Sequence, residues 1–233
     1  MKNRNAFTLI ELLVVIAIIA AMAVGFSKIK MGGSTQLAQS AQQILMSTFY
    51  EAKSAAQAKQ ARVRVLIFKG RDYERMLRHI GVVYEDMDEN GESKGWIAIS
   101  ESMLPKGVFF VPPESDFQSF CTVNQNYQVG DVIKSTFNSG ASGAPTIVGI
   151  SELSKRAQSM SEGNGDWYCY EFAPEGFSEN PSALVAVAMG ELGPKNLLIV
   201  ENPNEQLGFV IRRFGNCVGF SDYLEMETAT VKK

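Results

Sequence analysis

The chain of 233 residues opens with a polar segment and continues into a long apolar run. Beyond this run, apolar residues recur first at the spacing of a helix face and then at that of β-strands. Residues 7–26 form a run of 20 residues in which Glu11 is the only ionisable side chain. A helix of that length rises about 30 Å, which matches the hydrocarbon core of a membrane. The pattern therefore predicts a transmembrane helix over residues 7–26.

The next segment has the period of an amphipathic helix. Gly32 and Gly33 weaken its beginning, since each glycine costs about 1 kcal/mol relative to alanine, and Ser34 or Thr35 is suited to cap a new helix. Apolar and small residues then recur at the spacing of one helix face: Leu37, Ala41, Ile44, Leu45, Thr48, Phe49, Ala52 and Ala56. We therefore expect an amphipathic continuation of the helix within residues 27–61.

After residue 61 the pattern becomes that of β-strands. Short apolar or alternating segments are separated by turn residues. The strand candidates are 62–68, 80–85, 95–100, 108–111, 167–172, 184–188, 197–200, 209–213 and 217–220. The predicted fold class is α+β: a long N-terminal helix, with a transmembrane half and an amphipathic half, whose apolar face covers one sheet of a mostly antiparallel β domain at residues 62–233.

Residues 1–6 form a short polar leader ahead of the apolar run. Lys2 and Arg4 favour retention of this end on the cytoplasmic side of a membrane. An ordinary secretory signal is cut after its apolar region at a small-residue site, and residues 22–27 match such a site poorly. A cut between Ala6 and Phe7 would instead leave the apolar helix on the mature chain.

Glu11 is unfavourable in a membrane unless it has a partner. A charged side chain near the bilayer centre costs about 2.5–3.5 kcal/mol on insertion scales. A cut before Phe7 would create an α-amino group four residues away, about 6 Å along a helix. A plain membrane anchor leaves Glu11 as a stray charge, whereas the cut supplies a positive partner.

The stretch FTLIELLVVIA at residues 7–17 resembles the N-terminal signature of type IV pilins and of type II secretion pseudopilins. The resemblance implies a pilin-like fold, cleavage before Phe7 by prepilin peptidase, methylation of the new Phe7 amine, and assembly of the apolar helices into a filament core. It also implies that Glu11 pairs with the terminal amine of a neighbouring subunit. The family usually has glycine just before the cut, where this chain has Ala6.

A second set of short motifs resembles the minor pseudopilins of the H type and related minor pilins. The helix end EAKSAA leads into RVRV, a hairpin ends in GWIA, and LPKGV and FAPEG come later in the chain. Residues 117–166 are longer and more polar than this resemblance implies. We therefore expect an insertion near 117–166.

A candidate calcium loop lies between two of the predicted strands. Asp86, Asp88 and Asn90, followed by Gly91, match the opening of such a loop. The bidentate glutamate expected six residues after Gly91 is replaced by Ile97. Because Asn-Gly between apolar runs is typical of a hairpin, we expect a turn, with metal ligation by the three oxygen-bearing side chains as the alternative.

The three cysteines, Cys121, Cys169 and Cys217, would face an oxidising compartment if the domain is exported. An odd number cannot pair completely within one chain. Either one disulfide forms among them and leaves one thiol, or all three remain as reduced, buried thiols.

Little in the sequence points to catalysis. His79 is the only histidine and has no nucleophile motif beside it, and the glycine-rich stretch 139–145 lacks the Lys-Ser/Thr ending of a phosphate loop. The formal net charge of -3 comes without a basic patch of the kind that binds nucleic acid. We therefore expect no enzymatic activity, no cofactor and no nucleic-acid partner.

The sequence is best interpreted as a structural subunit, a minor pilin or pseudopilin of a type IV pilus or type II secretion pseudopilus. Its expected partners are other pilin or pseudopilin subunits, prepilin peptidase, the inner-membrane assembly platform and membrane lipid. We expect a single pass through the inner membrane, a periplasmic C-terminal domain, and a place in a filament after assembly. The alternative is an anchored extracytoplasmic binding or enzymatic domain with a pilin-type leader, which would not require the amphipathic helix.

Overall fold

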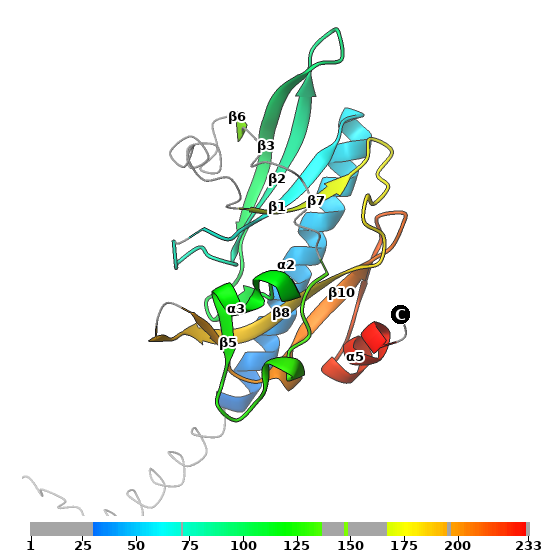
Figure 1. Ribbon diagram of the computed structural model, residues 1–233. Coiled ribbons are helices and arrows are strands. Elements are labelled where there is room, and N and C mark those ends of the chain that lie inside the picture. Colours follow the sequence, from blue (N-terminus) through cyan, green and yellow to red (C-terminus); the bar gives the residue numbers. More distant parts are fainter. Residues whose placement is uncertain (1–29, 71, 137–146, 149–166, 195–196, 232–233) are drawn as a thin grey trace, which may run out of the picture. The chain divides into compact units, whose positions relative to one another are not determined.

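The computed structural model describes residues 30–70, 72–136, 147–148, 167–194 and 197–231 (Figure 1). The chain divides into two compact units, Met1–Gln36 and Leu37–Lys233, and both sheets belong to the second. The predicted leader and transmembrane segment lie outside the described residues. Within the described ranges, no helix combines the length and the hydropathy needed to cross a membrane.

In the described residues, a long helix is followed by strands, with two short α-helices among and after them. Helix α2 spans Lys30–Lys59, and the first strands are β1 (Val63–Phe68), β2 (His79–Met87), β3 (Ser93–Met103) and β4 (Val108–Phe110). Helix α3 (Glu114–Phe120) precedes β5 (Cys121–Val123), the 3₁₀ helix η1 (Val129–Asp131), β6 (Ile147–Val148) and β7 (Trp167–Phe172). The remaining elements are β8 (Ala183–Leu192), β9 (Leu198–Val200), the 3₁₀ helix η3 (Pro203–Glu205), β10 (Leu207–Ile211), β11 (Cys217–Gly219) and α5 (Tyr223–Val231).

The described strands form two sheets. One has five strands in the order β6-β3-β2-β1-β7, and the other has six, in the order β11-β10-β8-β9-β5 with β4 paired to β8. Neighbours are antiparallel except for β3 with β6 and β5 with β9. The α+β class and the mostly antiparallel pairing are confirmed. The single sheet predicted beneath the helix is wrong, because β8 pairs with β10, β4 and β9 instead of extending the sheet that contains β7.

Helix α2 is continuous through Gly32 and Gly33. The predicted helix start at Ser34 or Thr35 is therefore wrong. Glycine lowers helix propensity, but nucleation is the costly step of helix formation. Once a helix is nucleated, each residue added to it gains one hydrogen bond. Two glycines inside a helix of 30 residues are consequently tolerated.

The C-terminal end of α2 is fixed by backbone geometry. Gln60 has a positive φ of 50°, and the N–H of Ala61 donates to the carbonyl of Ala56 at 3.3 Å. This left-handed residue and the 6→1 hydrogen bond are the features of a Schellman motif. The Gln60 side chain also donates to the carbonyl of Gln57 at 2.7 Å. The helix thus ends at Lys59, close to the predicted end.

Phe49 joins α2 to both sheets. Its fully buried ring makes edge contacts with Tyr170 and Phe172 of β7, at centroid separations of 5.2 and 6.2 Å. It makes a third edge contact, at 5.4 Å, with Phe209 of β10. Because β7 belongs to the five-stranded sheet and β10 to the six-stranded sheet, this one side chain contacts all three layers of the core.

The buried face of α2 consists mainly of small side chains. Its members are Ala38, Ala41, Leu45, Thr48, Phe49, Ala52 and Ala56. The helical period predicted all of these except Ala38. The period also places Leu37 on this face, but Leu37 is 39% exposed and Ala38 is fully buried. An alanine at that point lets the helix backbone approach the strands closely.

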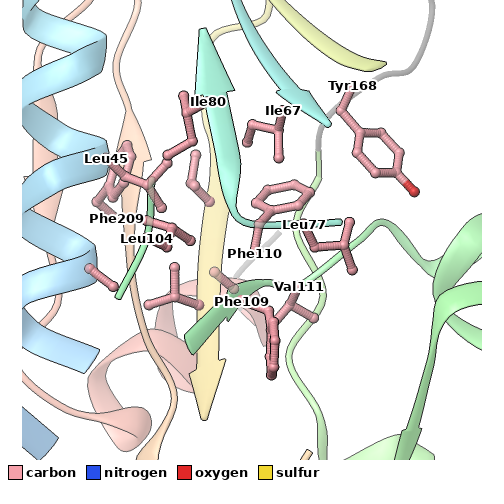
Figure 2. Packing of buried hydrophobic residues seen from close by; sticks show 14 of the residues in the cluster. Leu45, Ile67, Leu77, Ile80, Leu104, Phe109, Phe110, Val111, Tyr168 and Phe209 are labelled. Carbon is pink, nitrogen blue, oxygen red and sulfur yellow. The ribbon is translucent and has the colours of Figure 1, made fainter. Parts of the chain in front are cut away.

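The main core extends from α2 across both sheets. Figure 2 shows Leu45 and Phe209 near the helix and Phe110 farther inside. The N–H of Phe110 donates to the carbonyl of Leu77 at 2.8 Å, and the Phe110 ring lies 5.5 Å from that of Tyr168. Strand β4 of the six-stranded sheet is thereby tied to the β1–β2 connection and packed against β7.

Strand β1 is buried on both faces. Val63, Val65 and Ile67 belong to the main core, whereas Leu66 and Phe68 belong to a second apolar cluster that also contains Val83, Trp96 and Trp167. Side chains of a strand alternate between faces, so a strand covered on both sides reads as a continuous apolar run. This explains why residues 62–68 begin with alternation and end apolar.

The predicted insertion near 117–166 is described only at residues 117–136 and 147–148. Its first part is packed into the core, since Phe117, Cys121 and Val132 are all buried. The fully buried Gln206 accepts from the N–H of Ile133 at 2.9 Å and donates to its carbonyl at 3.1 Å. That amide replaces the backbone pairing that a neighbouring strand would supply.

Replacement of Phe49 by alanine should lower the free energy of unfolding by about 3–5 kcal/mol, the range for loss of a buried aromatic ring. Denaturant unfolding of the detergent-solubilised full chain is the measurement. Ser47→Ala, on the exposed side of the same helix, is the matched control and should change the stability by less than about 0.5 kcal/mol. Equal effects of the two substitutions would show that Phe49 does not join the layers.

Candidate functional site: the processing signal and the helix beyond it

The predicted processing residues Ala6 and Phe7 and the predicted assembly residue Glu11 all lie outside the described residues. The structure does describe the part of the chain beyond this signal: helix α2 and the domain to which it is attached. The geometry of that attachment decides whether the helix and the β domain form one rigid subunit.

A row of hydrogen bonds fastens α2 to the C-terminal part of the domain. The Gln42 side chain donates to two carbonyls, Gly208 at 2.6 Å and Phe220 at 2.9 Å. The Tyr50 hydroxyl donates to the carbonyl of Cys217 at 3.0 Å. Because a side-chain hydrogen bond to a backbone carbonyl fixes position as well as adding stability, these contacts set the position of the helix along the six-stranded sheet.

Two further bonds extend the row toward the end of the helix. Lys53 Nζ donates to Asn216 Oδ1 at 2.7 Å, and the Gln57 side chain donates to the carbonyl of Glu175 at 3.1 Å. The row therefore runs over four turns of α2, beside the apolar face that Phe49 occupies. Helix and domain are joined along most of the described helix from Leu37 onward.

The opposite side of α2 is exposed and nearly free of charge. Its exposed residues from Gln39 to Ala58 include Gln39, Ser40, Gln43, Ser47, Ser54 and Ala58. Glu51 is the charged residue on this side. The helix thus presents one face to its own domain and leaves a face of short, polar side chains open to solvent.

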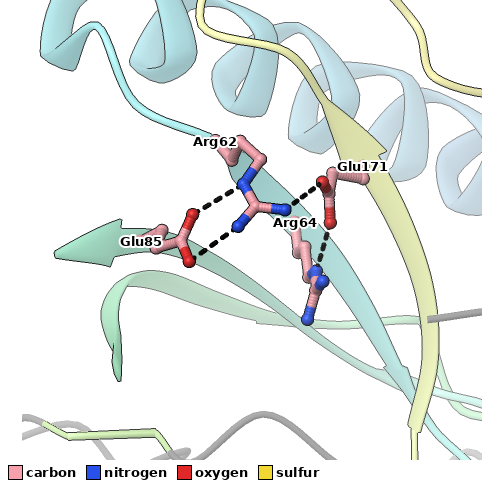
Figure 3. Close-up of polar contacts among 4 residues, drawn as sticks. All are labelled: Arg62, Arg64, Glu85 and Glu171. Carbon is pink, nitrogen blue, oxygen red and sulfur yellow. Dashed lines mark hydrogen bonds and ion pairs between the residues drawn. The ribbon is translucent and has the colours of Figure 1, made fainter. Parts of the chain in front are cut away.

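Two arginines and two glutamates form a chain of ion pairs on the five-stranded sheet (Figure 3). Arg62 contacts Glu85 twice, Nε to Oε2 at 2.6 Å and Nη2 to Oε1 at 2.8 Å, and reaches Glu171 at 3.4 Å. Arg64 Nε lies 2.5 Å from the other Glu171 oxygen. The guanidinium of Arg64 also lies over the Trp96 ring, 4.0 Å from its centroid.

These ion pairs link three neighbouring strands. Glu85 lies in β2 and Glu171 in β7, on either side of β1. This network was not predicted from the sequence. Arg62 and Arg64 stand two positions apart and so share one face of a strand, which indicates carboxylate partners, but only the strand register identifies them.

Glu85 remains charged although its side chain is only 4% exposed. Burial by itself raises the pKa of its carboxyl group. The hydrogen bonds from Arg62 and Ser93, with the positive charges of Arg62 and Arg64, outweigh burial and hold the pKa below its ordinary value of 4.5. The network therefore favours the ionised carboxylate in the folded protein.

The candidate metal residues Asp86, Asp88 and Asn90 lie at the tip of the β2–β3 hairpin, as expected for a turn. Asp88 Oδ1 accepts from the backbone N–H of Asn90 at 2.9 Å and of Glu92 at 2.8 Å. Gly91 has a φ of 80°, which glycine adopts without strain. The hairpin is confirmed. Among the described residues, no three His, Cys, Asp or Glu side chains are grouped as metal ligands.

Cys121, Cys169 and Cys217 are free thiols. Cys121 and Cys217 lie on opposite edge strands of the six-stranded sheet, four strand spacings apart. That separation is about 19 Å across a flat sheet, whereas a disulfide needs a Cα separation below about 7 Å. Of the two alternatives, the structure contains the reduced one, with Cys121 and Cys217 buried and Cys169 partly buried. Burial raises the pKa of Cys121 and Cys217 to about 12 and that of Cys169 to about 11.

His79 is a buried core residue. Its Nε2 lies 3.0 Å from Glu101 Oε2, and its ring lies 5.6 Å from that of Trp167. Burial lowers the pKa of His79, while the hydrogen bond and charge of Glu101 act in the opposite direction. The contact with Trp167 is packing and the contact with Glu101 is a hydrogen bond, so His79 has a structural role within the sheet.

Comparison with known proteins bears on the N-terminal segment. Residues 1–27 match the family described as the prokaryotic N-terminal methylation motif. The matched range contains the predicted leader, the Ala6–Phe7 junction and Glu11. The match supports the type IV pilin-like signal inferred from the sequence, together with processing by prepilin peptidase. No match was found among the curated proteins or among the solved structures.

The ion-pair network generates a prediction about acid stability. Because the pKa of Glu85 is lower in the folded than in the unfolded state, its stabilising contribution is present above about pH 4.5 and is lost as the pH falls through the folded-state value. Glu85→Gln should lower the stability by about 1–2 kcal/mol at neutral pH, since Arg62 is half-exposed and screened.

Urea unfolding at a series of pH values is the measurement. The stability of the wild type should fall more steeply than that of Glu85→Gln between about pH 5 and 3. Glu92→Gln, at the exposed hairpin tip, is the control and should follow the wild-type curve. Parallel curves for wild type and Glu85→Gln would contradict the assigned role of the network.

Proposed function

We propose that the chain is a minor pilin or pseudopilin subunit of a type IV pilus or a type II secretion pseudopilus. The observation that carries this proposal is the methylation motif at residues 1–27, which is followed at Lys30 by a helix built into a β-rich domain. Prepilin peptidase cuts before Phe7, the apolar segment anchors the subunit in the inner membrane, and the domain lies in the periplasm until assembly.

The way in which α2 is attached supports this assignment over a borrowed leader. An export signal needs no fixed geometry relative to the domain that it carries. Here Phe49 contacts both sheets, and a row of hydrogen bonds that begins at Gln42 fixes the helix beside β10 and β11. A subunit that is placed in a filament through its helix requires such a rigid connection.

The same proposal gives the finer assignments. The chain belongs with H-type minor subunits, its partners are other pilin-like subunits and the inner-membrane assembly platform, and membrane lipid surrounds the apolar segment before assembly. The subunit has no reaction of its own beyond the cleavage and methylation done to it. On its exposed helix side, Ser40, Gln43 and Ser47 are uncharged, and Glu51 is the charged residue there. Such a nearly uncharged side suits close approach of neighbouring subunits.

Processing is the first test of the proposal. The mature chain should begin with an N-methylated Phe7, because the leader and the retained apolar run are those of a prepilin. Mass spectrometry of the N-terminal peptide from the membrane fraction is the measurement. Ala6→Leu should block the cut, since the peptidase must accommodate that side chain, whereas Ala6→Gly should be processed fully. A mature chain that begins at Met1 or near Ser27 would reject the prepilin assignment.

Assembly is the second test. Glu11→Val should leave synthesis, cleavage and membrane insertion intact, because these depend on the leader and the apolar run. Its incorporation into sheared filaments should fall by roughly tenfold or more, since the Phe7 amine of the neighbouring subunit loses its buried partner. Quantitative immunoblots of membrane and filament fractions provide the measurement.

Leu13→Val is the matched control for assembly, as it changes an apolar side chain in the same run without changing charge. It should assemble at wild-type levels. Wild-type incorporation of Glu11→Val would instead identify Glu11 as a tolerated charge and favour the anchored-domain alternative.

A further inference from the structure

Two phenylalanine side chains form an exposed pair on neighbouring turns. Phe177 lies in the segment between β7 and β8, and Phe214 lies in the turn between β10 and β11. Their ring centroids are 5.6 Å apart, although Phe177 is 46% and Phe214 is 62% exposed. Exposed aromatic side chains that meet one another are unusual on a surface with no partner.

Backbone contacts hold both turns in place. The N–H of Ser178 donates to the carbonyl of Arg213 at 3.0 Å, which joins one turn to the other. Gly215 has a φ of 71° and lies so close to Gly176 that an added Cβ would come within 2.7 Å of the Gly176 carbonyl oxygen. The phenylalanines are thus displayed on a fixed support, which lowers the entropy cost of binding.

Two arginines flank the pair. Arg212 and Arg213 are exposed, and among the described residues neither forms an ion pair. Glu175 is exposed on the Phe177 segment, so the region is not uniformly basic. We name Phe177, Arg212, Arg213 and Phe214 the aromatic–arginine surface. Aromatic residues and arginine are the types that contribute most to protein interfaces.

The same chain carries a surface of opposite charge. The tip of the β2–β3 hairpin contains Asp86, Asp88, Glu89 and Glu92, and the hairpin protrudes in Figure 1. Met87, beside these carboxylates, is 45% exposed. The tip thus combines negative charge with a flexible apolar side chain of the kind that packs well against aromatic rings. We name residues 86–92 the acidic hairpin tip.

We propose that the acidic hairpin tip of one copy binds the aromatic–arginine surface of a second copy. Charge complementarity and the pairing of Met87 with the two exposed rings indicate this occupant. The mixed charge around Phe177, where Glu175 is exposed, disfavours a flat anionic lipid surface. Because the two surfaces differ, the contact is head to tail.

The inference rests on the proposed assembly role, since it assigns a contact between subunits, but its test has a separate readout. Two differently tagged full-length copies are co-expressed, one with Phe214→Cys and the other with Glu89→Cys. Mild oxidation of whole cells should give a mixed disulfide that carries both tags. Burial raises the pKa values of Cys121, Cys169 and Cys217, which lowers the thiolate fraction of the native thiols and hence their reactivity.

Control copies define the background. Lys106→Cys, at an exposed position after β3, replaces Phe214→Cys in one pairing, and each cysteine variant is also paired with itself. The mixed product should exceed every one of these controls. A product no larger than the controls, or a crosslink from Phe214→Cys to a different protein, overturns the second-copy assignment.

Charge reversal tests the chemistry of the contact. Arg212→Glu with Arg213→Glu, placed on the Phe214→Cys copy, should reduce the mixed disulfide by roughly tenfold or more. Asp86→Lys with Glu92→Lys, placed on the Glu89→Cys copy, should restore it. Glu191→Lys, exposed near the end of β8, is the control and should not. Loss without rescue overturns the pairing of these two surfaces.

The outcomes also separate this inference from the assembly role itself. Filament incorporation that depends on Glu11 but yields no mixed disulfide rejects the head-to-tail contact alone. A chain that never enters filaments and never crosslinks rejects both. Both are supported if Glu11→Val lowers the yield of the mixed disulfide and if, separately, the charge-reversed hairpin tip restores the yield lost through Arg212→Glu with Arg213→Glu.

Discussion

The edge contacts of Phe49 with Tyr170, Phe172 and Phe209 are the interaction on which the rest of the structure depends. One ring of α2 occupies the junction of two sheets that share no pairing between β7 and β10. Each sheet alone would leave an apolar face exposed to water, and the helix covers parts of both. The alanines on the same side of α2 meet this requirement, since larger side chains would hold the helix away from the strands.

A second constraint acts on the other face of the five-stranded sheet. Leu66 and Phe68 are buried there in an apolar cluster, next to the ion pairs of Arg62 and Arg64 with Glu85 and Glu171. Bidentate and bridging contacts of this kind tolerate no slip in strand register, because a shift by one residue turns every side chain to the opposite face. Apolar burial stabilises β1, and the charges specify its alignment with β2 and β7.

Much of this fold could be predicted from the sequence, and the failures have physical reasons. Every predicted strand segment overlaps an observed strand, with bounds that differ by several residues at some ends, because each combines apolar character with nearby turn residues. Strands β5 and β6 are short and pair in parallel with strands remote in sequence, so no local pattern reveals them. Helix α5 spans only nine residues, which is shorter than the window in which a helical period can be recognised. The partners Glu85 and Glu171 depend on long-range register, as does the meeting of Phe177 with Phe214. The N-terminal signal could be predicted because all of its residues lie in one short, continuous segment of the chain.

The row of side-chain bonds from Gln42 to Gln57 has a mechanical consequence. These bonds lie one after another along α2 and end on carbonyl or amide oxygens of the C-terminal part of the domain. A force directed along the helix therefore acts on them in shear and loads them together, whereas a force that peels the helix away would break them singly. The rings around Phe49 oppose the same sliding motion. The domain is consequently built to transmit axial load through the helix without separating from it.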